Sequence, residues 1–357
     1  MSFLIQGITL NRIESYINRV VMLKYKACLP DRKASHYFKR KSLLAVNSSL
    51  AVCFFIPFIS YAQLKWNNVD SLYAPLPPSL HIFKTTDSLD DKPFIAYYVI
   101  AKLKARDLDF TADTTFHRRF TPKQFYEKED HPLVVVNCSF FNFDRNQNLN
   151  VVIRDGKLAA YNIHTIPMKG KDTFQYKHPL GSAIGISKRR KADIAWLYTD
   201  SSHTKAFASQ SPVCPVKDSL LRTGYALFKT NARFKKWRMR TAVGGGPVLV
   251  QEGKIFITNE EELKFTGKAI RDKHPRTAMG YTKEGYLVIM VIQGRFPGIA
   301  EGATLEQEAK LLVDIGCIEA LNLDGGGSSC LLINGKETIK PSDKEGERPV
   351  PAVFIIK

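Results

Sequence analysis

Short apolar runs alternate with polar turns along most of the chain from residue 94 onward. Runs of this length, rich in Val, Ile, Leu and Phe, are typical of β-strands. They predict strands at residues 94–100, 133–136, 151–153, 183–186, 194–198, 248–250, 254–257, 287–292, 318–323, 330–333 and 353–356.

The connections between these runs are short and contain turn residues, as in Asp155-Gly156-Lys157 and Asn334-Gly335-Lys336. Tight turns of this kind join antiparallel neighbours. One helix is well signalled, because Thr304 and Gln307 have the spacing of a capping box, an apolar stripe follows, and Gly316 ends it. The pattern predicts an α+β fold made of β-rich, mixed, largely antiparallel sheets with a few packed helices.

The N-terminal segment has a different pattern. Lys39-Arg40-Lys41 precedes the apolar residues 43–60, and small residues follow at Ser60 and Ala62. This order predicts that residues 1–62 are a signal peptide cleaved after Ala62 or, if uncleaved, an N-terminal membrane anchor. Both alternatives export the remainder, so we expect an extracytoplasmic protein, periplasmic or secreted, with membrane contact only through residues 43–60 if they are retained.

The exported part divides into two regions by pattern. Residues 63–130 are irregular and predict an N-terminal extension or an accessory region, and residues 131–357 contain most of the predicted strands. An apolar content of 44% excludes disorder as the main state.

The net charge of +18 comes from 52 Lys and Arg against 34 Asp and Glu. Nine basic and two acidic residues, a surplus of seven, lie in residues 1–62, so the remainder carries +11. No helix-turn-helix, zinc-finger or RNA-recognition pattern accompanies this charge, and no nucleic-acid partner is predicted. The basic run Lys188-Arg189-Arg190-Lys191 is interpreted as a solvated loop.

The spacing of the Cys and His residues in the sequence does not match that of a metal-binding motif. Cys138, Cys214, Cys317 and Cys330 follow residue 62, and export would permit disulfides in three pairings among which the sequence does not choose. No Cys or His cluster has zinc spacing, so neither a metal nor another cofactor is predicted.

Two glycine-rich loops are candidates for chemistry. Asp324-Gly325-Gly326-Gly327-Ser328-Ser329 follows a predicted strand, and Gly244-Gly245-Gly246-Pro247 precedes another. Consecutive glycines allow positive φ and could place backbone N–H groups around an anion, although a plain hairpin turn would have the same composition.

Polar side chains occur beside these loops. Arg276 and Arg295 lie between them in the sequence, and Arg348 precedes the last predicted strand. Arginine presents a planar fork to phosphate or carboxylate, but many single arginines form only weak surface ion pairs. Asn137 ends a predicted strand next to Phe140, where an amide and an aromatic ring could contact a sugar or simply pack in the core.

In this order, the motifs resemble those of the phosphodiester glycosidase family over roughly residues 130–357. The matching segments are 137–141, 155–157, 245–249, 275–280, 294–295, 302–305, 320–329 and 348–351, of which 320–329 is the most specific. The family usually has two glycines after the asparagine, where this chain has Cys138 and Ser139.

The resemblance implies hydrolysis of a sugar-1-phosphodiester or other phosphate-bearing glycan, which releases the sugar and leaves a phosphomonoester. The hypothesis that follows gives Asp324 the role of nucleophile or water-activating base and gives Arg276 and Arg295 the role of a phosphate clamp. The expected substrate-binding residues are Asn137, Gly245, Gly246, Asn322, Gly325, Gly326, Gly327, Ser328 and Arg348. Two alternatives stay open: a non-catalytic envelope protein that binds anionic glycans, and a phosphodiesterase that cuts the P–O bond.

Overall fold

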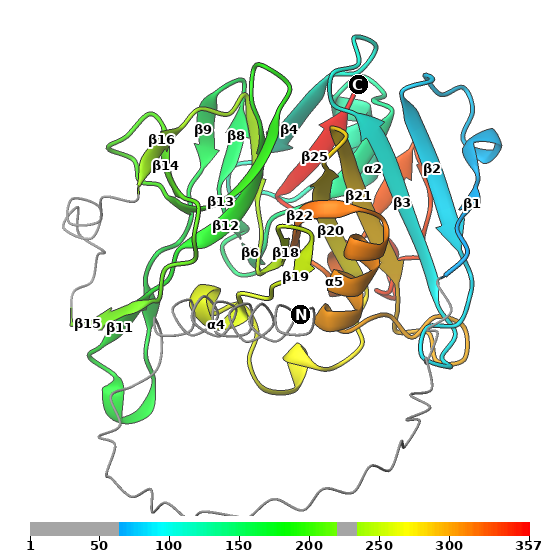
Figure 1. Cartoon of the computed structure of the whole chain (residues 1–357). Helices are drawn as coiled ribbons and strands as arrows, with labels where there is room; N and C mark the ends of the chain where they lie inside the picture. Colours follow the sequence, from blue (N-terminus) through cyan, green and yellow to red (C-terminus); the bar gives the residue numbers. More distant parts are fainter. Residues whose placement is uncertain (1–63, 220–233) are drawn as a thin grey trace, which may run out of the picture. The chain divides into compact units, whose positions relative to one another are not determined.

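Antiparallel β-sheet dominates residues 64–219 and 234–357, which are the residues that this computed structural model describes (Figure 1). The export segment predicted at residues 1–62 lies outside the described residues. The β-rich, largely antiparallel α+β prediction is confirmed.

The largest sheet has eight strands in the order β1-β2-β3-β21-β20-β22-β18-β19, each antiparallel to its neighbours. Their bounds are β1 (Asn67–Asn68), β2 (Leu80–Thr85), β3 (Ile95–Lys102), β18 (Val248–Gln251), β19 (Lys254–Ile255), β20 (Arg276–Thr282), β21 (Tyr286–Gln293) and β22 (Cys317–Asn322).

A seven-stranded sheet has the order β16-β14-β13-β12-β17-β8-β9, and a five-stranded sheet has the order β24-β23-β5-β25-β4. The seven-stranded sheet contains β8 (Val152–Arg154), β9 (Lys157–Ala160), β12 (Gly181–Ile186), β13 (Ala192–Tyr198), β14 (Ala206–Ser209), β16 (Lys235–Trp237) and β17 (Thr241–Gly244). The five-stranded sheet contains β4 (Phe110–Thr114), β5 (Val134–Asn137), β23 (Leu331–Ile333), β24 (Lys336–Glu337) and β25 (Ala352–Ile356).

Two small sheets complete the set, one of β10 (Ile166–Pro167), β11 (Tyr176–His178) and β15 (Val216–Asp218), and one of β6 (Phe141–Asn142) and β7 (Gln147–Asn148). All the strands predicted from the sequence are present, within a few residues of the predicted ends.

One core joins the three large sheets. Val136 of β5, Trp196 of β13, Met279 of β20 and Phe354 of β25 all belong to it, and each is at most 1% exposed. Complete burial of such a side chain contributes about 1.5–3 kcal/mol. The shared core therefore fixes the sheets against one another, and with them the strand ends that carry the site.

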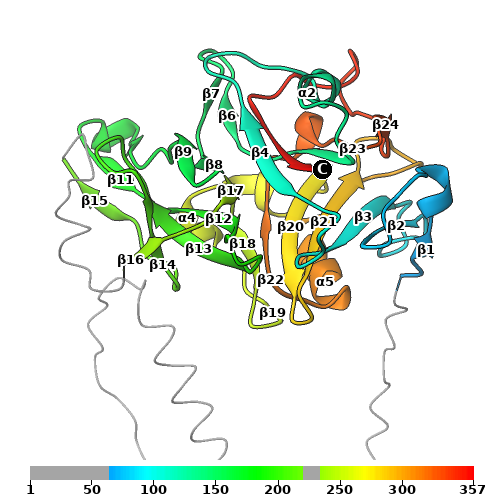
Figure 2. The same cartoon turned by 90° about the horizontal axis from the view of Figure 1, so that it is seen from above.

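Helices cover the outer faces. Helix α5 (Leu305–Asp314) has the predicted capping box between Thr304 and Gln307, is followed by Gly316 at φ +99°, and packs against β18, β20 and β22 (Figure 2). Helix α2 (Pro122–Lys128) packs Phe125 against the five-stranded sheet.

The remaining helical segments are short, namely α4 (Asn259–Glu262) and the 3-10 turns η1 (Asp70–Leu72), η2 (Gly170–Asp172), η3 (Gly267–Ile270) and η4 (Gly326–Ser328). In residues 64–219 and 234–357, no helix has the length and apolar character to span a bilayer.

Residues 64–130 belong to the same sheets. Strand β3 lies between β2 and β21 in the eight-stranded sheet, and β4 pairs with β25 in the five-stranded one. Gln63–Lys357 forms one compact unit. Because Cys138, Cys317 and Cys330 are buried free thiols, none of the three pairings that the sequence allowed is formed.

Candidate active site

The candidate side chains meet at one end of three neighbouring strands. Arg276 begins β20, Arg295 follows β21, and Asp324 follows β22. The register pairs Arg276 with Ile292 and Ala278 with Asn322, so these three termini lie at the same edge of the eight-stranded sheet. Asn137, at the end of β5, contacts Asp324, so the five-stranded sheet also contributes a strand end to this site.

Asp324 is held by both sheets. Its N–H donates to the carbonyl of Cys138 at 2.8 Å, and its own carbonyl accepts from Asn137 Nδ2 at 2.6 Å. Burial raises the pKa of the Asp324 carboxyl to about 7, opposed by hydrogen bonds from Ser328 and Gly325 and by the charge of Arg348. A carboxyl with this pKa can exchange a proton at neutral pH, which suits general acid or base chemistry.

The glycines after Asp324 let two guanidinium groups lie against the backbone. A Cβ on Gly326, whose φ is +62°, would be 2.9 Å from Arg295 Nη2, and one on Gly327 would be 2.1 Å from Arg348 Nη2. Neither position has room for a side chain.

The backbone predicted to cradle an anion over residues 325–328 is partly engaged within the protein. The loop folds as the 3-10 turn η4, in which the Gly326 N–H donates to the carbonyl of Pro275 at 2.8 Å and the Ser328 N–H to that of Gly325 at 3.2 Å. The arginines packed on the loop add positive charge beside it.

Arg348 and Arg295 differ in their partners. Arg348 forms a two-pronged ion pair with Asp343, at 2.7 and 2.9 Å, and its Nη1 donates to Ser328 Oγ at 3.4 Å. Arg295 is exposed and makes no ion pair within the part of the chain that the structure describes. Arg295 is thus the guanidinium most available to a phosphate, whereas Arg348 positions Ser328 next to Asp324.

Arg276 is 2% exposed and lies over the ring of Phe265, at 5.6 Å from its centroid. Its Nε donates to the carbonyl of Ala303 at 3.0 Å and its Nη2 to that of Asp272 at 3.3 Å. Nearby Glu308 is fully buried, and burial raises the pKa of its carboxyl to about 8. Burial therefore opposes the ionisation of Glu308 and weakens the compensation that it gives to the charge of Arg276.

Asn137 and Asn322 are completely buried, and Asn322 Oδ1 has no hydrogen-bond partner among the described residues. Asn137 Oδ1 accepts from Thr277 Oγ1 and from the N–H of Cys330, both at 3.0 Å. Asn322 Nδ2 donates to the carbonyls of Gly246 and Leu323 at 2.9 and 2.7 Å. Both amides support the loop that carries Asp324.

Gly245 and Gly246 lie behind that loop. A Cβ on Gly245 would be 2.5 Å from the carbonyl oxygen of Asn322, and one on Gly246 would be 2.3 Å from Glu262 Oε2. Their small size permits the close approach of the segment before β18 to the end of β22, which is a packing role.

Replacing Asn137 by Ala should lower the free energy of unfolding by about 3 kcal/mol, because Thr277, Cys330 and Asp324 would each lose a buried partner. Urea unfolding measures this. Asn142→Ala, which removes an exposed turn amide, is the control and should cost less than about 1 kcal/mol. A stable Asn137→Ala protein with a raised KM would instead indicate direct contact with the sugar.

The structure also brings in three residues that the sequence pattern did not assign, namely His274, Phe265 and Lys264. His274 Nδ1 is buried with no hydrogen-bond partner, and burial together with Arg276 and Arg295 lowers the pKa of the ring. Phe140 and Phe265 lie edge to face at 6.0 Å, and Lys264 Nζ is 5.4 Å from the Phe140 ring. Among these three, only His274 gave a signal in the sequence, through its position next to Pro275-Arg276.

Among residues 64–219 and 234–357, no three His, Cys, Asp or Glu side chains are grouped so that they could hold a metal ion. The chemistry available at the site is that of a carboxyl group with a raised pKa, a neutral imidazole, three guanidinium groups and an aromatic pair.

Known proteins share the sequence motifs and the fold. The bovine and human N-acetylglucosamine-1-phosphodiester alpha-N-acetylglucosaminidases are each 33% identical to this chain over 103 residues, which is 27% of the chain and 19% and 20% of those proteins. The matched segment therefore spans about a fifth of the length of these relatives.

Among solved structures, the catalytic domain of the zebrafish N-acetylglucosamine-1-phosphodiester alpha-N-acetylglucosaminidase, auto-inhibited by its pro-peptide, has a TM-score of 0.53. It is 21% identical, over 80% of this chain and 85% of that one, and the likeness shows the fold. The profile of the phosphodiester glycosidase family matches residues 130–357, and the chain therefore belongs to that family.

Proposed function

We propose that this protein is an exported hydrolase that cleaves the glycosidic bond of a sugar-1-phosphodiester, releasing the sugar and leaving a phosphomonoester on the other product. The observation that carries the proposal is the Asp324 carboxyl, whose pKa is raised to about 7 on a loop flanked by Arg295 and Arg348. Family membership supports the reaction class, and the pattern of residues 1–62 supports export.

The phosphate side of the reaction needs little proton transfer, because a phosphomonoester is already a good leaving group. The site must instead stabilise the negative charge that develops on the phosphate as the bond breaks. Arg295 is exposed over Gly326 and can donate directly to phosphate oxygens, whereas Arg276 is 2% exposed and adds positive charge behind it. Neutral His274 adds a donor or acceptor between these two arginines.

The sugar side requires a group that attacks the anomeric carbon or activates water for that attack, as the C1–O bond to phosphate breaks. Ionised Asp324 can do either, and Ser328 and Gly325 hold its oxygens in place. Phe140 and Phe265 supply aromatic surface beside the charged groups, and a sugar ring can pack against such a surface.

A panel of nucleotide-linked and aryl-linked sugar-1-phosphodiesters, incubated with the purified chain from residue 63, tests the proposal. Release of free sugar together with a phosphomonoester is the expected outcome. Binding of the same ligands without turnover would identify a glycan-binding protein instead.

The pH dependence follows from the pKa of Asp324. Because the attacking or water-activating form is the ionised carboxylate, kcat/KM should rise as the pH increases through about 7 and level off above it. Rates from pH 5 to 9 at constant ionic strength measure this. A rate that falls through the same range would assign the protonated, proton-donating role to Asp324.

A further inference from the structure

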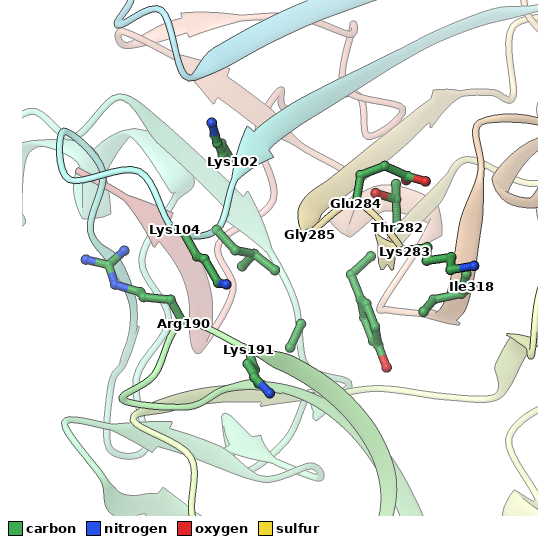
Figure 3. A pocket seen from close by; sticks show the side chains of 12 residues that line it. Lys102, Lys104, Arg190, Lys191, Thr282, Lys283, Glu284, Gly285 and Ile318 are labelled. Carbon is green, nitrogen blue, oxygen red and sulfur yellow. The ribbon is translucent and has the colours of Figure 1, made fainter.

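A second charged cavity lies at the opposite end of the strands that carry the site. It has a volume of about 300 Å³ and is formed by the end of β3, the turn between β12 and β13, and the turn between β20 and β21 (Figure 3). Strand β20 runs from Arg276 at the active site to Thr282 in this cavity. Seven residues of strand span about 20–24 Å, so one phosphate group cannot occupy both places.

The lining is strongly basic. The lining contains one acidic residue, Glu284, and five basic residues, Lys102, Lys104, Arg190, Lys191 and Lys283. None of the four lysines forms an ion pair within residues 64–219 and 234–357. Some lysines elsewhere do have acidic partners, as Lys128 has Asp113 and Lys217 has Asp172.

Arg190 is held in a fixed position. Its Nη1 donates to the carbonyl of Leu108 at 2.8 Å, its Nη2 lies 3.3 Å from Asp109 Oδ1, and its guanidinium lies 5.2 Å from the centre of the Phe110 ring. Arg190 and Lys191, the second half of the basic run interpreted from the sequence as a solvated loop, therefore line the cavity, and two other turns bring lysines to it (Figure 3).

Apolar side chains of Leu103, Ala192 and Ile318 complete the lining. Lysines without ion-pair partners, next to apolar side chains, suit a ligand in which negatively charged groups alternate with carbon-rich units. Membrane surfaces and nucleic acids also carry repeated phosphates, but a cavity of this size admits about one sugar-phosphate unit rather than a flat bilayer or a stacked strand.

We propose that this cavity, named here the basic pocket, is a non-catalytic subsite that binds a phosphate-bearing segment of a polymeric phosphodiester glycan while another bond of the same chain lies at Asp324. This inference rests on the proposed function, because it takes the polymer to contain the same phosphodiester bonds that the active site cleaves. Binding there raises the local concentration of cleavable bonds at the active site.

The binding test uses tripolyphosphate as the probe in calorimetric titrations at low ionic strength. The variant Lys102→Gln, Lys104→Gln, Lys191→Gln, Lys283→Gln should bind it about tenfold more weakly than the wild-type protein. The control removes the same charge outside the basic pocket, as Lys169→Gln, Lys171→Gln, Lys235→Gln, Lys236→Gln, and should change the affinity by less than about twofold. Equal weakening in both variants, or none in the first, would overturn the proposal.

A kinetic test separates this inference from the proposed function. The pocket variant should keep the wild-type kcat and KM on a small sugar-1-phosphodiester and show a severalfold higher KM on an oligomer of the same unit. An unchanged KM on the oligomer contradicts the subsite. A wild-type protein that hydrolyses neither substrate contradicts the proposed function, and tripolyphosphate binding then still decides whether the basic pocket binds anions.

The same two variants distinguish other macromolecules. If a single-stranded oligonucleotide or phosphatidylglycerol vesicles bind through the basic pocket more tightly than the sugar-1-phosphodiester oligomer, the assignment to a glycan phosphodiester is wrong.

Discussion

Substituting Asp324 by Asn should reduce kcat by about 10²- to 10⁴-fold, with little change in KM or in stability. The substitution keeps the size of the side chain and a hydrogen-bond acceptor for Ser328 and Gly325, but removes the charge that would attack the anomeric carbon or activate water. Stopped assays on the best small substrate, together with thermal unfolding of the variant, measure both effects.

Asp193→Asn is a matched control. Its carboxyl is also buried enough to have a raised pKa, and it accepts hydrogen bonds from Trp237 and Gln210 far from the glycine loop. This variant should keep the wild-type kcat. Turnover of Asp324→Asn within a few-fold of the wild type, in a folded protein, would remove Asp324 from the chemistry.

Replacing Glu262 by Ala should have the largest effect on stability, a loss of about 3–5 kcal/mol. Its two oxygens accept five hydrogen bonds at 2.7–3.2 Å, from the N–H and hydroxyl of Ser182, Trp196 Nε1, the N–H of Val248 and Thr258 Oγ1. Four of these donors belong to β12, β13 and the start of β18, and the fifth, Thr258, precedes α4, so one carboxylate joins the seven-stranded sheet to the eight-stranded one.

Urea unfolding measures that loss, and Glu260→Ala is the control because Glu260 is exposed on the same short helix. A destabilisation by Glu262→Ala no greater than that by Glu260→Ala would show that the buried network contributes little. Since Gly246 packs directly against Glu262, the variant should also lose activity as the support behind Asn322 loosens.

Most of the long strands were predictable because they are buried and therefore appear in the sequence as short apolar runs. Such a run can be recognised without knowing which strand lies beside it. Helix α5 was predictable from its capping box and apolar stripe. Strand β20 was missed because Arg276, Thr277 and Gly280 interrupt its apolar pattern, yet it is almost wholly buried between β21 and β22. Helix α2 was missed although Thr121 and Gln124 form the same kind of capping box, since only Phe125 and Pro122 are buried on it.

The sequence predicted which side chains could lie together at the candidate site, and their roles stay predictions. The motifs placed Asp324, Arg276 and Arg295 together, and the structure brings them to one edge. The inward-facing position of Asn137 could not be predicted, because its partners Thr277, Asp324 and Cys330 are more than a hundred residues away in the chain. The basic pocket was hidden for the same reason, since its lysines come from three separate turns.

Hydrolysis of a sugar-1-phosphodiester in oxygen-18 water tests the central proposal most directly. Water that attacks the anomeric carbon leaves every oxygen of the phosphomonoester in place, so mass spectrometry of that product should show no label. Oxygen-18 in the phosphomonoester would mean that water attacks phosphorus, and the protein would be a phosphodiesterase that cuts the P–O bond rather than a glycosidase.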